Sequence, residues 1–371
     1  MRVVICPDKF AGTLSAPAAA NAIAQGWAAV APGDELVRKP LADGGPGFLD
    51  VISAAVGGDR LPVRVCDPLG RPADGEVLLT GDVAYVESAQ ACGLHLLSSA
   101  ERDPKRTTSY GLGLLLAAAV ESGAAKIVIG LGGSATNDGG AGMLAALDAA
   151  PLDESGMALP YGGVALAHCA GLGGPPQLRG VALVAATDVD NPLTGVSGAS
   201  AVFGPQKGAD ANDVQLLDAA LERFGEVLQG LPGAPPDLAS LPGAGAAGGI
   251  GAALYALGGS RESGIDLVSR LAGLDAAIGD AELVITGEGS FDFQSLRGKV
   301  VAGVAAAAQA RGVPCLVLAG QVSVGRREAS AAGIADAYAV AAHVGSVEQA
   351  LAAPARSLSS LAERVARQWS H

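Results

Sequence analysis

The sequence predicts an α/β fold: a doubly wound parallel sheet built from both chain ends, with a second α/β domain of mixed sheet inserted between them. Apolar strand segments alternate with amphipathic helices at each end, and neither end alone has enough strands for a complete sheet. The middle of the chain opens with strand segments of alternating polarity around a turn, which predicts antiparallel pairing. Half of the residues are apolar but only 4% are aromatic, a composition that suits closely packed α/β layers.

The two chain ends supply the elements of the first predicted domain, residues 1–60 and 283–371. Its strands are continuous apolar runs, which are typical of strands covered on both faces. The expected strands are residues 2–6, 35–39, 283–286, 315–319 and 337–341, and the expected helices are residues 16–31, 47–56, 300–310, 326–332 and 347–367. Because helices connect these strands, we expect the strands to be parallel.

The residues between these ends, 61–282, form the predicted inserted domain. Segments 60–65 and 76–87 are expected to pair as antiparallel strands around a turn at residues 67–70. Buried strands are expected at 126–131 and 181–186, and helices at 107–122, 141–147, 213–231 and 245–257. We expect the active site in the cleft between the two domains, because ligand sites are common at domain interfaces.

The charge and composition of the chain exclude several classes of protein. A net charge of −13 disfavours nucleic acid as a partner, because phosphate binding needs a basic surface. No uncharged apolar run approaches the roughly 20 residues that cross a bilayer, and no apolar leader follows Met1, so we expect a cytoplasmic protein without a membrane partner. Five cysteines without CxxC spacing and four scattered histidines predict reduced thiols and no zinc site. Both a monomer and a homodimer are compatible with the sequence.

The glycine-rich segment 132–142 is the most informative stretch of the chain. It follows the expected strand 126–131 and precedes an expected helix, an arrangement in which free backbone N–H groups and the helix dipole bind anions. Glycine also lets the backbone approach a phosphate closely. The alternative is a tight βα turn, in which glycine serves packing and Asn137 and Asp138 serve the turn. Similar segments elsewhere in the chain favour a binding site.

Six further segments combine glycine with aspartate, serine, threonine or lysine. They are residues 7–15, 42–47, 186–193, 203–208, 242–249 and 286–292. Four of the seven segments directly follow predicted strands, and the ligands of open α/β sheets lie outside the carboxyl ends of strands. Several of these loops are therefore expected to face one crevice.

Lysines and carboxylates are concentrated in the same loops. Three of the six lysines, Lys9, Lys207 and Lys299, lie in or just after these segments. Lysines and backbone N–H groups bind phosphates, one carboxylate binds Mg²⁺, and another carboxylate orients or deprotonates the acceptor hydroxyl. Asp188 and Asp190, two positions apart in a loop, are able to point to one cation, although an Asx-turn alone explains one of them. The residues thus predict phosphoryl transfer. The chain has no Walker motif, no protein-kinase motif set and no GxSxG motif.

Taken in order, these segments resemble the bacterial glycerate kinase family over nearly the whole chain. The motifs are PDKFAGTLS at residues 7–15, ADGG at 42–45, GLGGSATNDGGAGM at 130–143, Asp188 with NPL at 191–193, FGPQKG at 203–208, GAGAAGG at 243–249, and ITGEG at 285–289 with Asp292. The resemblance implies ATP-dependent phosphorylation of D-glycerate with Mg²⁺, with 2-phosphoglycerate as the expected product. It also implies a Rossmann-like domain split across both termini and a second, inserted α/β domain.

The candidate site residues come from these loops. We expect Asp8, Lys9, Asp188 and Asp190 to be catalytic, and Asp188 and Asp190 to hold Mg²⁺. The residues expected to bind substrate or phosphate are Asp43, Gly44, Gly45, Gly132, Gly133, Ser134, Thr136, Asn137, Asp138, Lys207, Gly287, Glu288 and Asp292. Asp43 has the alternative role of a turn or N-cap residue. The sequence does not assign ATP and glycerate to particular loops.

Some positions depart from the family pattern. Lys9 stands where the family commonly has serine and Ala11 where it has lysine, while Pro46, Phe48 and Ser290 replace a glutamate, a threonine and an arginine. These differences leave open a kinase for a related small sugar acid. Another kinase family, whose members carry a Gly-Leu-Gly-Ser-Ser-Ala loop, is an alternative. Only residues 130–135 of this chain resemble that loop, and the other six segments have no place in the pattern of that family. A non-catalytic anion or nucleotide sensor is disfavoured, because so many carboxylates repel an anion unless a metal intervenes.

Overall fold

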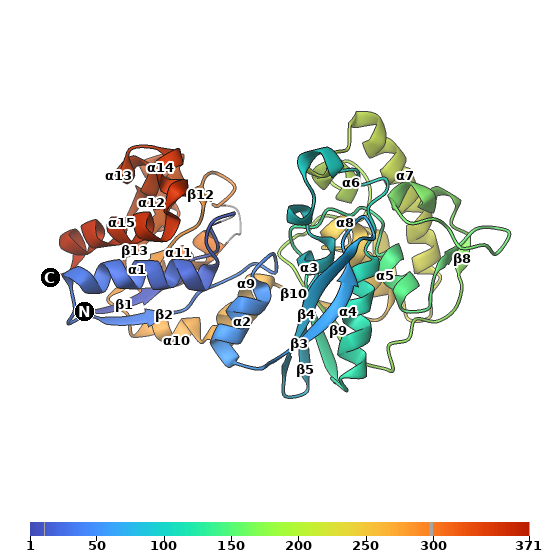
Figure 1. Cartoon of the computed structure of the whole chain (residues 1–371), viewed down its shortest axis with the longest axis horizontal. Helices are drawn as coiled ribbons and strands as arrows, with labels where there is room; N and C mark the ends of the chain where they lie inside the picture. Colours follow the sequence, from blue (N-terminus) through green and yellow to red (C-terminus); the bar gives the residue numbers. More distant parts are fainter. Residues whose placement is uncertain (11, 297–299, 371) are drawn as a thin grey trace. The chain divides into compact units, whose positions relative to one another are not determined.

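Both ends of the chain contribute to one folding unit, and the middle forms another (Figure 1). The computed structural model describes residues 1–10, 12–296 and 300–370. The first unit consists of Met1–Asp43, Asp50–Gly57 and Ile265–His371, and the second of Gly44–Leu49 and Gly58–Gly264. The two units have separate apolar cores. The architecture confirms the predicted α/β class.

The first unit is built on a parallel sheet with strand order β15-β13-β11-β1-β2. Its strands are β1 Arg2–Ile5, β2 Glu35–Arg38, β11 Leu283–Thr286, β13 Cys315–Ala319 and β15 Asp336–Ala339. N-terminal and C-terminal strands are direct neighbours, since Val4 of β1 pairs with Val284 of β11. A short parallel pair, β12 Ser290–Phe291 and β14 Gln321–Val322, extends beyond the ends of β11 and β13.

In the first unit, the N-terminal helix packs closely on the C-terminal one. The helices of this unit are α1 Ala16–Val30, α2 Phe48–Val56, α9 Gly264–Ala272, α10 Leu274–Gly279, α11 Val300–Gln309, α12 Arg326–Ala331, α13 Val340–Val344, α14 Val347–Ala352 and α15 Pro354–Trp369, of which α2 and α9 begin in residues of the second unit. Ser15 is the N-cap of α1, and its hydroxyl accepts a hydrogen bond from Ala18 N. A Cβ atom at Gly26 would lie 2.0 Å from Ser359 O, so only glycine lets α1 and α15 approach this closely.

The second unit has a mixed sheet with strand order β10-β9-β6-β5-β4-β3. Its strands are β3 Asp59–Cys66, β4 Pro72–Thr80, β5 Val83–Glu87, β6 Lys126–Gly130, β9 Ala182–Ala186 and β10 Ser260–Glu262, and a separate short hairpin is β7 Pro151–Leu152 with β8 Gly171–Leu172. Within the mixed sheet, the pairs β3–β4 and β4–β5 are antiparallel and the other pairs are parallel, and the separate pair β7–β8 is antiparallel. The carboxyl ends of β3, β5, β6 and β9 therefore lie at one edge of the sheet.

The helices of the second unit supply many of the small residues, chiefly alanine, that form its core. They are α3 Ala89–Cys92, α4 Tyr110–Glu121, α5 Ala141–Ala146, α6 Ala199–Phe203, α7 Ala211–Gln229 and α8 Ala246–Ala256, with 3₁₀ turns at Leu94–Leu96, Ser99–Glu101, Gly163–His168, Pro205–Lys207 and Leu238–Ser240. Every residue of α8 is buried. Among the described residues, no helix is long and apolar enough to cross a membrane.

The structure corrects several predicted elements. The single closing helix 347–367 is two helices, α14 and α15, because Ala353 leaves the helical conformation before Pro354. The segment 76–87 spans two strands, β4 and β5, that are separated by the turn at residues 81–82. The helix expected at 213–231 is α7, Ala211–Gln229, which begins two residues earlier because Asp210 is its N-cap and accepts a hydrogen bond from Asp213 N.

The point at which the chain returns from the second unit to the first also differs from the expected boundary at residue 283. The first unit resumes at Ile265, so the helices α9 and α10, which the sequence analysis did not anticipate, belong almost wholly to it. α10 contacts α11, which accounts for this grouping. The amphipathic character of α9, with Leu267 and Val268 buried, is the signal that the sequence analysis overlooked.

Candidate active site

The switch point of the parallel sheet lies between β1 and β11. From β1 the chain proceeds to β2 on one side, whereas from β11 it proceeds to β13 and β15 on the other side. Ligands of open α/β sheets bind outside the carboxyl ends of strands at this point. Asp8 follows β1 and Glu288 follows β11, and both are buried. Asp8 N donates a 2.8 Å hydrogen bond to Gly287 O, which holds the two strand ends together.

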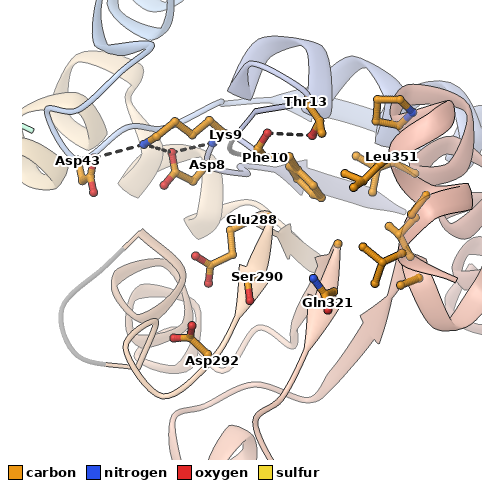
Figure 2. Close-up of a pocket in the computed structure, with 18 residues that line it drawn as sticks. Asp8, Lys9, Phe10, Thr13, Asp43, Glu288, Ser290, Asp292, Gln321 and Leu351 are labelled. Atoms are coloured by element: carbon orange, nitrogen blue, oxygen red, sulfur yellow. Dashed lines mark hydrogen bonds and ion pairs between the residues drawn. The ribbon is translucent and has the colours of Figure 1, made fainter. Parts of the chain in front are cut away.

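Lys9 lies between two carboxylates in this region (Figure 2). Its Nζ is 3.6 Å from Asp8 Oδ1 and 3.6 Å from Asp43 Oδ1, so the lysine takes part in two ion pairs. Burial raises the pKa of Asp8 to about 6, even though Lys9 opposes that shift. Burial also acts to lower the pKa of Lys9, but Asp43 and Asp8 together hold it above its usual value. Lys9 is thus charged, and Asp8 titrates close to neutral pH.

These residues line one end of a cavity of about 440 Å³. Asp8, Lys9, Asp43, Glu288 and Asp292 form the polar end of the cavity. Its apolar lining residues are Phe10, Val340, Val347, Leu351 and Leu358. Figure 2 shows the carboxylates on one side and Leu351 on the other, with Ser290 and Gln321 in between. The cavity therefore has two chemically distinct ends.

The polar end of the cavity has side chains of the kind that hold Mg²⁺ together with a phosphate chain. Among the described residues, no group of three or more His, Cys, Asp or Glu side chains forms a cage for a metal. Mg²⁺ in kinases is usually held by only one or two carboxylates together with substrate phosphates and water. Asp8, which pairs with Lys9, and Glu288, which lines the same cavity, supply that kind of donor set. The residues therefore fit a metal that arrives with a phosphorylated ligand.

In the second unit, the glycine-rich segments pack on one another. A Cβ atom at Gly132 would lie 2.6 Å from Gly45 Cα, and one at Gly44 would lie 2.7 Å from Ala186 O. On the other side of the loop, Gly139 N donates to Gly248 O over 2.9 Å, and a Cβ at Gly248 would lie 2.0 Å from Thr136 O. Packing, the alternative considered from the sequence, thus accounts for these glycines. Their role in binding an anion stays a prediction.

The polar residues of the 132–142 loop are largely internal. Ser134, Thr136, Asn137 and Asp138 are buried, the last three completely. The Asp138 carboxylate accepts hydrogen bonds from Ser109 N and Oγ and from the backbone N–H groups of residues 140 and 142. Burial raises the pKa of Asp138 although these donors oppose the shift. Asp138 therefore fixes the start of α5.

Lys207 is a second lysine of the candidate list, and it is almost completely buried. Its Nζ donates to Ser134 Oγ over 3.0 Å and to Thr136 O over 2.6 Å. Burial lowers its pKa to about 7, and the nearby Asp138 only partly offsets the shift. The side chain therefore links the FGPQKG segment to the glycine-rich loop.

Asp188 and Asp190 follow β9 but have different partners. Ser263 Oγ donates a 2.6 Å hydrogen bond to Asp188 Oδ1. Asp190 pairs with Arg261, whose Nη2 lies 2.6 Å from Asp190 Oδ1, and its side chain is 76% exposed. The two carboxylates are thus engaged by separate groups on and just after β10.

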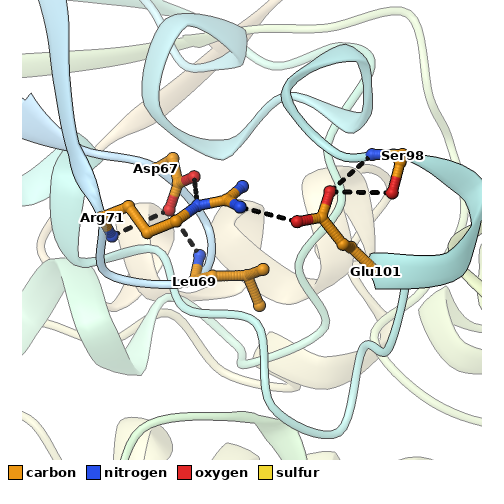
Figure 3. Close-up of polar contacts among 5 residues, drawn as sticks. All are labelled: Asp67, Leu69, Arg71, Ser98 and Glu101. Carbon is orange, nitrogen blue, oxygen red and sulfur yellow. Dashed lines mark hydrogen bonds and ion pairs between the residues drawn. The ribbon is translucent and has the colours of Figure 1, made fainter.

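A polar network fixes the turn after β3 at the same sheet edge (Figure 3). Asp67 accepts hydrogen bonds from Leu69 N, Arg71 N and Arg71 Nε, and Arg71 Nη1 donates to Glu101 over 2.6 Å. Glu101 also accepts from Ser98 N and Oγ, and these bonds together with Arg71 lower its pKa to about 2. The predicted turn at residues 67–70 thus carries an ionic network that the sequence analysis did not anticipate.

Two residues that sequence reasoning missed follow or end predicted strands. Glu87 ends β5, is buried, and accepts hydrogen bonds from Gly47 N and Leu49 N at the start of α2. Gln321 follows β13 and lines the cavity of the first unit. The rule that identified Asp8, the search for polar residues at strand ends, would have found both.

The positions that depart from the family pattern have different environments. Phe48 is fully buried, and a Cβ atom at Gly130 would lie 2.7 Å from its ring, so it is a core residue. Pro46 contacts the loop, because a Cβ at Gly133 would lie 3.0 Å from its Cδ. Ser290 lines the cavity. Ala11 and Lys299 lie outside the described residues.

Comparisons with known proteins show the family to which the chain belongs. The model of the glycerate kinase family matches residues 3–370. A glycerate kinase of Bacillus subtilis (strain 168) is 43% identical over 87% of this chain and 86% of its own length, and a glycerate 2-kinase of Escherichia coli (strain K12) is 41% identical over 94% and 93%. A crystal structure of a protein provisionally named glycerate kinase 2, from Salmonella typhimurium LT2, gives a TM-score of 0.79 at 38% identity, over 99% of this chain and 98% of that one. The chain therefore belongs to the glycerate kinase family and is a kinase.

Proposed function

We propose that the chain transfers a phosphoryl group from ATP to a hydroxyl group of D-glycerate, with Mg²⁺, and that the product is 2-phosphoglycerate. The observation that carries this proposal is the pair of ion pairs that joins Lys9 to Asp8 and Asp43 at the switch point of the sheet. Glu288 lines the same cavity, and the chain belongs to the glycerate kinase family. A lysine among carboxylates suits phosphoryl transfer, because the lysine neutralises phosphate charge while carboxylates hold the metal.

The residues of the first unit have the following proposed roles. Lys9 contacts the transferred phosphate or its neighbour, since its ammonium group is charged and lines the cavity. Asp8 and Glu288 hold Mg²⁺, which when bound neutralises the charge of the phosphate oxygens. Asp43 orients Lys9 through its ion pair. All of these residues lie at or near the carboxyl ends of β1, β2 and β11.

Asp188 and Asp190 keep the roles expected from the sequence, as Mg²⁺ ligands or as the group that orients the acceptor hydroxyl. Of the two, Asp188 is the better candidate, because it is half-buried and accepts a hydrogen bond from a neutral hydroxyl. Asp190 is exposed and already pairs with Arg261. Glycerate carries a carboxylate of its own, so its binding requires donors such as loop N–H groups.

The activity is tested with purified protein, ATP, Mg²⁺ and D-glycerate in an assay that couples ADP release to a change in absorbance. We expect turnover with D-glycerate and none with the L-enantiomer in the same assay. Phosphorus NMR of the product distinguishes phosphorylation at the 2-position from that at the 3-position. Absence of turnover across a panel of small hydroxy acids would overturn the proposal.

A kinase for a related small sugar acid is the second candidate function. The observation that favours it is Ser290, which lines the cavity where the family commonly has arginine. Phe48, another departure, does not support it, because this side chain belongs to the core. A higher kcat/KM for another hydroxy acid than for D-glycerate would decide for this candidate.

A further inference from the structure

We infer that the cavity of the first unit is the nucleotide site, with the base at the apolar end and the phosphate chain with its cation at the polar end. This inference rests on the proposed function and adds what the sequence left open, the part of the chain that holds ATP. It assigns a base-binding role to Val347 and Leu351 of α14, which carry none of the candidate chemistry.

The shape of the cavity suits a nucleotide better than a small hydroxy acid. Its volume of about 440 Å³ lies within the usual range for small-molecule sites, roughly 300–1,000 Å³. A nucleoside triphosphate has one flat apolar end and one highly charged end, and so does this cavity. D-Glycerate has no apolar portion that would use Phe10, Leu351 and Leu358.

The charge of the polar end also disfavours a free anion such as glycerate. Among the described residues that line the cavity, four carry carboxylates, Asp8, Asp43, Glu288 and Asp292, and one, Lys9, carries an ammonium group. An isolated anion would be repelled by this set, whereas a phosphate chain that brings a divalent cation would be attracted. The observed donor set thus selects a cation-bound ligand.

Between the two ends, backbone hydrogen bonds hold Ser290 and Gln321 in register. Gly320 N donates to Glu288 O over 3.0 Å, and Gln321 N donates to Gly289 O over 3.1 Å. Ser290 therefore pairs with Gln321 in the short parallel ladder of β12 and β14. Figure 2 shows both side chains between Glu288 and the apolar end, where a ribose would lie. Their hydroxyl and amide groups are suitable partners for sugar hydroxyls.

The test measures binding of the full chain, without glycerate, to two probes in excess Mg²⁺ by calorimetry. One probe is AMP-PNP, and the other is inorganic tripolyphosphate, which lacks base and ribose. The double variant Val347→Ser/Leu351→Ser removes apolar groups that are 40% and 57% exposed, so the fold should tolerate it. Its control is Val202→Ser/Leu216→Ser in the second unit, where the replaced side chains are 45% and 54% exposed.

We expect the double variant at 347 and 351 to weaken AMP-PNP binding about tenfold, while tripolyphosphate binding changes less than about twofold. The control variant should leave both affinities unchanged. Lys9→Met should weaken both probes, because it acts on the polar end that they share. Equal AMP-PNP affinities for the wild type and the 347/351 variant would overturn the inference.

The failure of this inference is distinguishable from failure of the proposed function. If the protein turns over D-glycerate but the 347/351 variant binds AMP-PNP normally, the nucleotide lies elsewhere and the proposed function stands. If the variant loses AMP-PNP affinity but the wild type turns over no hydroxy acid, the site assignment stands and the proposed function is wrong.

Discussion

The ammonium group of Lys207 donates a 3.0 Å hydrogen bond to Ser134 Oγ, although the two residues are far apart in the sequence and both are buried. The same nitrogen donates to Thr136 O. A lysine in such a place is costly when charged, because burial removes its water. It holds the glycine-rich loop from within, so we expect a positioning role rather than direct contact with phosphate.

This placement predicts how stability depends on pH. The folded-state pKa of Lys207 is lowered from 10.5 to about 7, so between these values the unfolded chain binds one proton more than the folded chain. Stability must therefore rise with pH in that window. The free energy of unfolding of the wild type, measured with urea and compared with that of Lys207→Met, should increase by about 2 kcal/mol between pH 7 and pH 9. A difference between the two proteins that is constant with pH would contradict the assignment.

The Asp8–Lys9 pair predicts a pH limb in activity. With a pKa of about 6, Asp8 is a carboxylate above that pH and loses its ability to hold a cation below it. We expect kcat/KM for ATP to rise through about pH 6. Since the charge of Lys9 lowers the pKa of Asp8, Lys9→Met should move this limb to higher pH.

The matching control is Asp8→Asn. Its residual kcat/KM should no longer rise through about pH 6, because the titrating carboxylate is absent. Lys105→Met serves as a second control, because Lys105 pairs with Asp213 in the other unit. A limb that stays in place or moves to lower pH in Lys9→Met would show that Asp8 is not the titrating group.

Asp188 and Asp190 offer a matched pair of variants in one loop. Asp188→Asn should reduce kcat by about a hundredfold or more if this carboxylate orients the acceptor or the metal. Asp190→Asn removes an exposed ion pair with Arg261, which is worth little, and should change kcat less than about threefold. Steady-state kinetics with D-glycerate measures both, and the opposite order of effects would exchange their assignments.

Rules for strand ends were enough to find much of the candidate site from the sequence. Asp8, Lys9 and Glu288 were selected because polar residues follow apolar strands, and the structure brings them to one cavity. The apolar end was not predictable in this way. Its residues Val347 and Leu351 fall within the single closing helix that the sequence predicts over 347–367, whereas in the structure the break at Ala353 separates α14 from α15.

The glycine-rich loop shows the limit of local reasoning more clearly. A sequence window reveals that Gly132 allows close approach, but it does not reveal what approaches. In the structure the neighbour is Gly45, a residue of a distant glycine-rich segment. The same residue pattern therefore predicts an anion nest and a backbone contact equally well, and only the fold distinguishes the two.

Gly132→Ala separates these two roles. The added Cβ would lie 2.6 Å from Gly45 Cα, a backbone atom that cannot rotate away, so the two segments must move apart. Overpacking of this kind costs about 1–3 kcal/mol. We expect a lower midpoint of urea unfolding for Gly132→Ala, and no change for the control Gly171→Ala, which has open space at its Cβ in the same unit. If Gly132→Ala keeps wild-type stability but loses affinity for AMP-PNP or D-glycerate, the glycine serves a ligand rather than packing.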